Sequence, residues 1–203
     1  MSTAQELFRE SSLVPLFRRG LVFVQCKRPA ADQLIASAAV ELAPHLRFRH
    51  HDTRDLESRA LRAPGPGARA SPARCAVLPL VEIHGSTDGV ADLVAGYKAL
   101  GHRRGLWVKG HIAELPTATL CQFDALFLFH MSEGDFNHVR SSVPLGDSAA
   151  KELEDSVDAS GRAYESVLCV VTSPAIGEQP LPRLTPRPTV LPLTPHDRDA
   201  SLP

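Results

Sequence analysis

The sequence has few aromatic residues, no paired cysteines and no long apolar run. Aromatic side chains make up 5% of its 203 residues and apolar residues 43%, so a core can form but is expected to be mainly aliphatic. The four cysteines include no CxxC pair, and no cluster of histidine, cysteine or acid has ligand spacing, so we predict neither a disulfide framework nor a metal site. No stretch reaches the roughly 20 apolar residues that cross a bilayer, and residues 1–10 carry no signal core. We therefore expect a soluble, intracellular protein of cytoplasm or nucleus without a membrane partner.

An excess of charge of one sign is also missing. The chain has 22 basic and 23 acidic residues, which excludes a strongly basic nucleic-acid coat protein and a polyacidic tail. The charges are segregated, however, because residues 1–74 hold 12 basic and 7 acidic side chains and residues 82–165 hold 7 and 13. The basic part would suit a phosphate backbone, although ordinary solvated faces explain the same numbers.

Apolar runs of strand composition alternate with segments of helical periodicity. Strands are predicted at residues 20–26, 46–49, 75–84, 106–108, 124–130 and 164–171. Helices are predicted at residues 30–42, 52–62, 88–100, 117–121, 133–142 and 147–157. Such alternation predicts a three-layer α/β fold, with a mainly parallel sheet and helices on both faces. Pro79 conflicts with its strand because it cannot donate to a sheet ladder, so we expect a bulge or a weakened strand there.

Two segments fall outside this alternation. Residues 63–74 are rich in proline, glycine and alanine and cannot bury enough surface to order themselves, which predicts a mobile loop. Residues 173–203 hold eight of the 17 prolines and no helical or strand period, which predicts a disordered, Pro-rich tail. The expected organisation is an N-terminal arm at 1–19, an α/β domain at 20–172 and the tail.

A series of short motifs runs from residue 75 to residue 171. A hydrophobic strand ends in an acid (Leu80-Val81-Glu82-Ile83-His84), a basic turn with glycines follows (residues 101–105), and the next strand, Leu106-Trp107-Val108, leads into Lys109-Gly110. Asp124 then stands near the start of a further strand. This layout resembles the distal half of RecA-like motor ATPases of the DNA-pumping group, which includes the FtsK and HerA translocases, conjugative coupling proteins and the packaging ATPases of large DNA viruses.

The resemblance implies roles for particular residues. Glu82, at a strand's carboxyl end, would orient Mg²⁺ and water, and Arg103 and Arg104 would reach the phosphate of a neighbouring subunit. Lys109 and His111 would contact nucleotide or nucleic acid. The residues alone identify no cofactor. The resemblance implies ATP and Mg²⁺ as possible cofactors, and nucleic acid and further copies of the chain as possible partners.

The departures from this family pattern are large. The phosphate-binding loop GxxxxGK[ST], which supplies backbone amides and a lysine to the phosphates, is absent. Glu82 stands alone where the family has an Asp-Glu pair, and the Thr-Gln sensor position reads Lys109-Gly110. The resemblance therefore implies a truncated or degenerate P-loop NTPase-like domain, RecA-like but incomplete, that does not hydrolyse ATP on its own. If the first strand of the family's sheet were also missing, its neighbour would be left with an unpaired edge.

Three other hypotheses stay open. The chain would be a non-catalytic α/β scaffold that recruits a partner through Pro-x-x-Pro strings in residues 181–195, or a fragment that does not fold alone. More weakly, residues 20–42 resemble the first strand and helix of the second lobe of superfamily-2 helicases, although only residues 102–105 echo that lobe's later motif. A translocase relative should project Glu82, Arg103 and Lys109 from one sheet edge, whereas a scaffold need not.

Overall fold

The computed structural model describes only part of the chain with certainty. The described residues are 8–9, 13–26, 30–42, 46–52, 76–84, 87, 89–99, 105–129, 132–143, 151, 166–171, 175–176, 179–180 and 189–192. The predicted loop at 63–74, nearly all of the predicted helix at 52–62 and all but Lys151 of the one at 147–157 lie outside them. Among the described residues, no helix is both long and apolar enough to cross a membrane.

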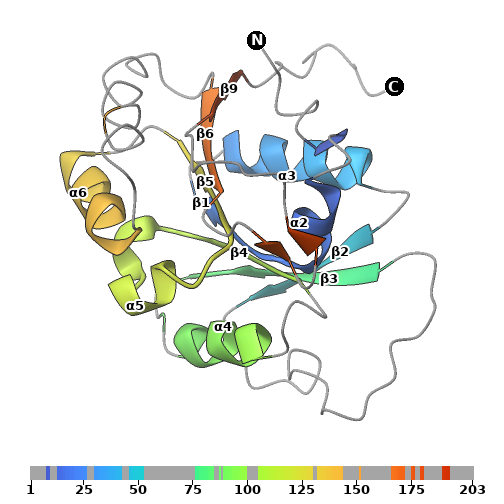
Figure 1. Cartoon of the computed structure of the whole chain (residues 1–203), viewed down its shortest axis with the longest axis horizontal. Coiled ribbons are helices and arrows are strands. Elements are labelled where there is room, and N and C mark those ends of the chain that lie inside the picture. The colour runs from blue at the N-terminus through green and yellow to red at the C-terminus, as the bar shows by residue number, and fades with distance from the viewer. Residues whose placement is uncertain are drawn as a thin grey trace.

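Seven of the described strands form one sheet in the order β2-β3-β4-β1-β5-β6-β9 (Figure 1). Its parallel part consists of β1 (Leu21–Gln25), β2 (Leu46–Asp52), β3 (Ala76–Glu82), β4 (Leu106–Gly110) and β5 (Ala125–Leu128). Strands β6 (Ser166–Val171) and β9 (Thr189–Pro192) join antiparallel beside β5. The prediction of a mainly parallel, RecA-like α/β fold is confirmed.

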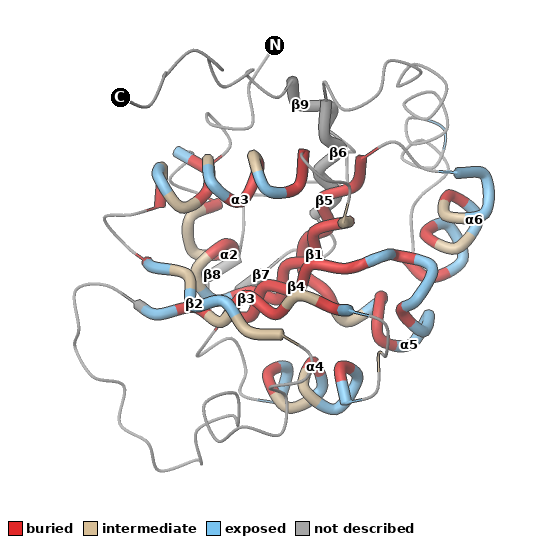
Figure 2. Tube along the Cα trace, turned by 180° about the vertical axis from the view of Figure 1, so that it is seen from behind, coloured by how far each residue is buried: buried red, intermediate tan, exposed pale blue. Residues whose placement is uncertain are grey.

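Helices cover both faces of the sheet. Helices α2 (Val14–Arg19) and α3 (Ala30–Glu41) lie on one face, and α4 (Val90–Ala99), α5 (Thr117–Leu120) and α6 (Glu133–Ser142) lie on the other (Figure 1). Every residue of β1, β4 and β5 is buried, as expected for parallel strands with helices above and below (Figure 2). Alternate side chains of each of these strands therefore pack into two separate hydrophobic cores, one on each face of the sheet.

The core on the α2–α3 face is more aromatic than the composition suggests. The indole of Trp107 lies 4.8 Å from the ring of Phe48 and within about 6.3 Å of three further rings, those of Phe8, Phe17 and Phe127. Its Nε1 donates to the backbone oxygen of Phe17 at 2.9 Å. This core is still mainly aliphatic, as expected, because most of its buried residues are Leu, Val, Ile and Ala, and its aromatic rings gather around Trp107.

Strand β1 extends the parallel sheet beyond the segment that resembles the distal half of a motor domain. It lies in the middle of the sheet, paired in parallel with both β4 and β5. The parallel sheet therefore includes a strand that lies well before residue 75 in the sequence. The same placement gives no support to a separate helicase-like lobe at residues 20–42, because that strand and helix share one sheet with the rest.

Pro79 sits inside β3 without interrupting it. All seven residues of β3 pair with β2, but pairing with β4 begins only at Leu80. The proline therefore lies where one side of the strand has no ladder, which is the kind of position a residue without an N–H tolerates.

Parts of both predicted end segments belong to the folded structure. Phe8, Leu16 and Phe17 of the predicted arm are fully buried, and Arg9 makes a two-pronged ion pair with Glu41 at the end of α3. In the predicted tail, β7 (Ala175–Ile176) and β8 (Gln179–Pro180) form a hairpin pair, and β9 pairs with β6. The free edge of β6 offers backbone groups that Thr189-Val190-Leu191, a run of good strand formers, can satisfy. The domain boundaries at 19/20 and 172/173 stay predictions.

Candidate functional site

The site lies at the carboxyl edge of the parallel sheet, between β4 and β1. From β1 the chain passes through α3 to β2, which lies beyond β4 and β3 on one side of β1. After β4, the next strand of the parallel part is β5, on the opposite side of β1. The strand order therefore reverses between β1 and β4. In open α/β sheets ligands bind at such a reversal, outside the carboxyl ends of the strands. Lys109 stands there, with Val24 of β1 and Glu82 of β3 as its register partners.

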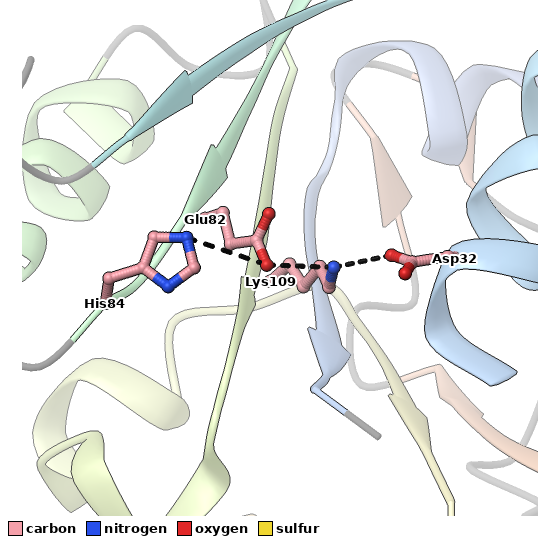
Figure 3. Close-up of polar contacts among 4 residues, drawn as sticks. All are labelled: Asp32, Glu82, His84 and Lys109. Atoms are coloured by element: carbon pink, nitrogen blue, oxygen red, sulfur yellow. Dashed lines mark hydrogen bonds and ion pairs between the residues drawn. The ribbon is translucent and has the colours of Figure 1, made fainter. Parts of the chain in front are cut away.

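Lys109 is held between two carboxylates (Figure 3). Its Nζ donates to Asp32 Oδ1 at 2.5 Å and lies 2.9 Å from Glu82 Oε1. Glu82 Oε1 is also 3.7 Å from His84 Nε2, a contact that is an ion pair only when the imidazole is protonated. We call Asp32, Glu82, His84 and Lys109 the Lys109 cluster.

The three charged side chains differ in how far they reach solvent. The lysine side chain is 4% exposed, that of Glu82 is 22% exposed and that of Asp32 is 55% exposed. A lysine at a strand end can bury its methylene stem while its ammonium finds charged partners. Asp32 is in the first turn of α3, where the helix dipole favours a negative charge. Each partner is thus placed by a separate element of the fold.

The pKa of Lys109 reflects two opposing influences. Burial by itself would lower the pKa, because it penalises the charged ammonium. The hydrogen bonds to Asp32 and Glu82, together with their negative charges, outweigh burial and raise the pKa above its ordinary value of 10.5. The side chain is therefore an ammonium throughout the neutral pH range.

ATP with Mg²⁺, which the resemblance implies, does not fit these residues. Only Cys26-Lys27-Arg28-Pro29 connect β1 to α3, a stretch that is shorter than the phosphate-binding loop, contains no glycine and has a proline without an amide donor. The first turn of α3 presents the carboxylate of Asp32 where a phosphate would dock. Among the described residues, no three histidine, cysteine or acidic side chains are placed to hold a metal ion.

The structure brings together some of the predicted site residues. Glu82 and Lys109 meet at the sheet edge. Arg103 and Arg104 lie outside the described residues. The expectation that Glu82, Arg103 and Lys109 project from one edge therefore holds for Glu82 and Lys109 and stays a prediction for Arg103. His111 is exposed just after β4, where it precedes the short 3-10 helix η2 (Ile112–Glu114). The catalytic and nucleotide-binding roles of these residues stay predictions.

Gly110 has a packing reason for lacking a side chain. A Cβ at this position would lie 2.8 Å from Cδ1 of Ile83 and 3.1 Å from its Cβ, so a larger residue would require the Ile83 side chain to shift. The Ile83 side chain, which follows β3, therefore occupies the space that a sensor side chain at Gly110 would need.

Two acidic residues at this edge were missed by the sequence reasoning. Asp32 lies within the predicted helix at 30–42 and has no predicted role, although an acid in the first turn of a helix after a buried strand is a usable signal. Asp52 ends β2 and is the register partner of Glu82, so Asp52, Glu82 and Lys109 form one row across three strands. The strand was predicted to end at residue 49, which hid this alignment.

Comparison with known proteins gives only distant structural likenesses. No protein-family model matches the chain, and no curated protein resembles it in sequence. The genome packaging NTPase B204 from Sulfolobus turreted icosahedral virus 2, in complex with ATP-gammaS, has a TM-score of 0.44 and 9% identity, covering 80% of this chain and 98% of that chain. The DNA-packaging ATPase B204 from Sulfolobus turreted icosahedral virus has a TM-score of 0.45 and 10% identity, covering 77% and 94%. Likenesses this loose carry no argument about what this chain binds or does.

Proposed function

We propose that this chain is a P-loop NTPase-like α/β domain that does not hydrolyse nucleotide on its own, because an internal lysine takes the place of the metal. The observation that carries the proposal is the ammonium of Lys109 shared between Asp32 and Glu82. The resemblance of residues 75–171 to DNA-translocating and packaging ATPases and the RecA-like sheet support the relation to that class.

The first step of the argument concerns the cation. In the family that the sequence resembles, the acid at the end of this strand orients Mg²⁺. Here the carboxylate of Glu82 already faces an ammonium at 2.9 Å. A metal ion would have to displace the ammonium of a lysine that is 4% exposed from one of its two carboxylate partners, which costs free energy because the charge is buried.

The second step concerns the phosphate. A helix N-terminus binds phosphate through its free amides and its dipole. The first turn of α3 instead carries Asp32, whose carboxylate is bonded to Lys109. A phosphate at this position would meet a like charge and a connection with too few amide donors to enclose it.

Calorimetric titration of the purified full chain with MgATP tests the proposal. We expect no binding tighter than about 1 mM, which corresponds to about −4 kcal/mol. A dissociation constant of about 100 μM or lower would overturn the proposal. Near-ultraviolet circular dichroism of Trp107, which is fully buried, shows in the same samples that the protein is folded.

Nucleic acid stays the proposed macromolecular partner, on the strength of the resemblance. Arg47 and Arg49 are both exposed on the edge strand β2 and would contact phosphates. Fluorescence anisotropy with labelled duplex DNA should show weak, strongly salt-dependent binding that falls in the Arg47→Ala, Arg49→Ala double variant. Binding that is absent at low salt would remove this part of the proposal.

The alternative, a scaffold that recruits a groove-type domain through residues 181–195, has less support. Thr189–Pro192 lies within that stretch and forms β9, whose backbone is paired with β6. While they are paired with β6, these four residues form a β-strand and not the polyproline II ligand that groove-type domains bind.

A further inference from the structure

A cavity of about 480 Å³ opens beside the Lys109 cluster, between α3 and strands β2 and β3. Most of its lining is apolar and comes from Ile35, Ala36 and Ala39 of α3, Leu46 and Phe48 of β2, and Leu80 of β3. The volume is within the range of roughly 300–1,000 Å³ that small-molecule sites occupy. The cavity is thus large enough for an organic molecule with an apolar body.

The shape of the cavity follows from the sequences of α3 and the two strands. Ala36 and Ala39 line it with methyl groups where longer side chains would fill the space against β2. On the sheet side, Leu46 and Leu80 are only 1% and 2% exposed, so they form a deep apolar wall. A ligand would therefore bury apolar surface on both sides, which is the main source of affinity in such sites.

The charged side chains of the lining balance one another. The two acids are Asp32 and Glu82, and the two bases are Lys109 and Arg47. Both acids already contact the Lys109 ammonium, and Arg47 is exposed, where pairing with an ion gains little. The remaining polar residue, His50, is also exposed and adds no charge while its imidazole is neutral. An ionic ligand would therefore lose its hydration without meeting a buried, unbalanced charge.

The ammonium of Lys109 has one hydrogen-bond donor left over. An ammonium carries three N–H groups, and among the described residues only Asp32 and Glu82 accept from it. The lysine side chain is 4% exposed and lines the cavity, and a buried donor without an acceptor costs free energy. The oxygen of a neutral carbonyl group would satisfy this donor without adding a charge beside the two acids.

We propose that this cavity binds an uncharged organic molecule with an apolar body, which lies between α3 and β2, and a carbonyl oxygen, which accepts the third N–H of Lys109. This site goes beyond the proposed function and does not depend on it, because it requires neither nucleotide nor metal.

Trp107 provides a built-in reporter for the cavity. It is the only tryptophan of the chain, and its ring meets the ring of Phe48, a lining residue, edge-on at 4.8 Å. A ligand that displaces Phe48 should change the tryptophan emission.

The experiment compares three probes that share a phenylethyl body and differ in charge: 3-phenylpropionamide, 3-phenylpropionate and 3-phenylpropylammonium. Each is titrated into the full chain at pH 8, followed by Trp107 emission and by calorimetry. We expect the neutral amide to bind at least about tenfold more tightly than either ion. Equal or tighter binding of either ion, or no binding of the amide at millimolar concentration, would overturn the proposal.

A first pair of variants locates the apolar body of the ligand. Ala36→Phe should abolish binding of the amide by filling the cavity, whereas Ala95→Phe, at an exposed alanine of α4, should leave it unchanged. If Ala36→Phe binds the amide as the natural protein does, the ligand lies elsewhere and the proposal is wrong.

A second pair of variants tests the hydrogen bond. Lys109→Met should weaken the amide about tenfold, because the donor to its carbonyl oxygen is lost. Lys151→Met, at an exposed lysine, should have no effect. Near-ultraviolet circular dichroism of Trp107 shows that each variant is folded. Unchanged binding of the amide to folded Lys109→Met would contradict the role given to this lysine.

Discussion

Two lysines bind carboxylates at opposite edges of the sheet, and their burial is reversed. At the carboxyl edge, Lys109 is 4% exposed and its partner Asp32 is 55% exposed. At the amino edge, the carboxylate of Asp124 is fully buried, and its partner Lys98, 2.8 Å away, is 39% exposed. The same chemical pair thus buries its cation in one place and its anion in the other.

The surroundings explain what each pair does. Asp124 also accepts the backbone N–H of Leu21 at 2.8 Å, so it fastens the first residue of the central strand, and Lys98 in the last turn of α4 completes that contact. Lys109 joins the side chains of two different elements beside a cavity. The amino-edge pair has a structural role, and the carboxyl-edge pair belongs to the candidate site.

The largest effect is expected at the amino edge. Lys98→Met removes the lysine partner of a fully buried carboxylate and should lower the free energy of unfolding by about 3 kcal/mol. Urea unfolding measures it, and the double variant with Asp124→Asn should recover part of the loss because the buried charge is gone. A loss below about 1 kcal/mol would show that the burial of Asp124 does not set the strength of this pair.

A smaller effect is expected from removing the more deeply buried lysine. Lys109→Met leaves Glu82 and Asp32, both of which reach solvent, so the free energy of unfolding should fall by about 1–2 kcal/mol. The same urea experiment gives the comparison. If Lys109→Met destabilises the protein more than Lys98→Met, the contrast between the two edges fails.

The two acids of the Lys109 cluster should also differ. Asp32→Asn, at the most exposed partner, should change the free energy of unfolding by about 0.5 kcal/mol, and Glu82→Gln should lower it by about 1 kcal/mol. If Asp32→Asn were the more destabilising variant, the contact of Lys109 with Asp32 of α3, and not the contact with Glu82 of β3, would hold the lysine in place.

The smallest effect is the dependence on pH. Because the pKa of Lys109 is raised in the folded protein, its stabilising contribution is complete below 10.5 and is lost only as the pH rises through the higher, folded value. The difference in stability between the natural protein and Lys109→Met should be constant from about pH 8 to 10 and shrink above that. A difference that shrinks already below pH 10 would contradict the raised pKa.

The sequence predicted most of the fold because continuous apolar runs mark buried parallel strands whatever their order. It also placed Glu82 and Lys109 at one sheet edge, since both end such runs. It could not predict Asp32 as a partner, because an acid at a helix start has the same local pattern whether or not it meets a lysine 77 residues away. Strand β9 was missed for a similar reason: four residues in a Pro-rich stretch become a strand only because the edge of β6 is there to pair with.

The most direct test of the central claim is to measure the pKa of the Lys109 ammonium itself. Nuclear magnetic resonance of the lysine side chains, with Lys109→Met to assign the signal, follows its titration. We predict a pKa above 10.5 in the natural protein and a lower one in Glu82→Gln, because the carboxylates outweigh burial. A pKa at or below 10.5 in the natural protein would contradict the account, since the ammonium would then not be held by both acids in the place of a metal.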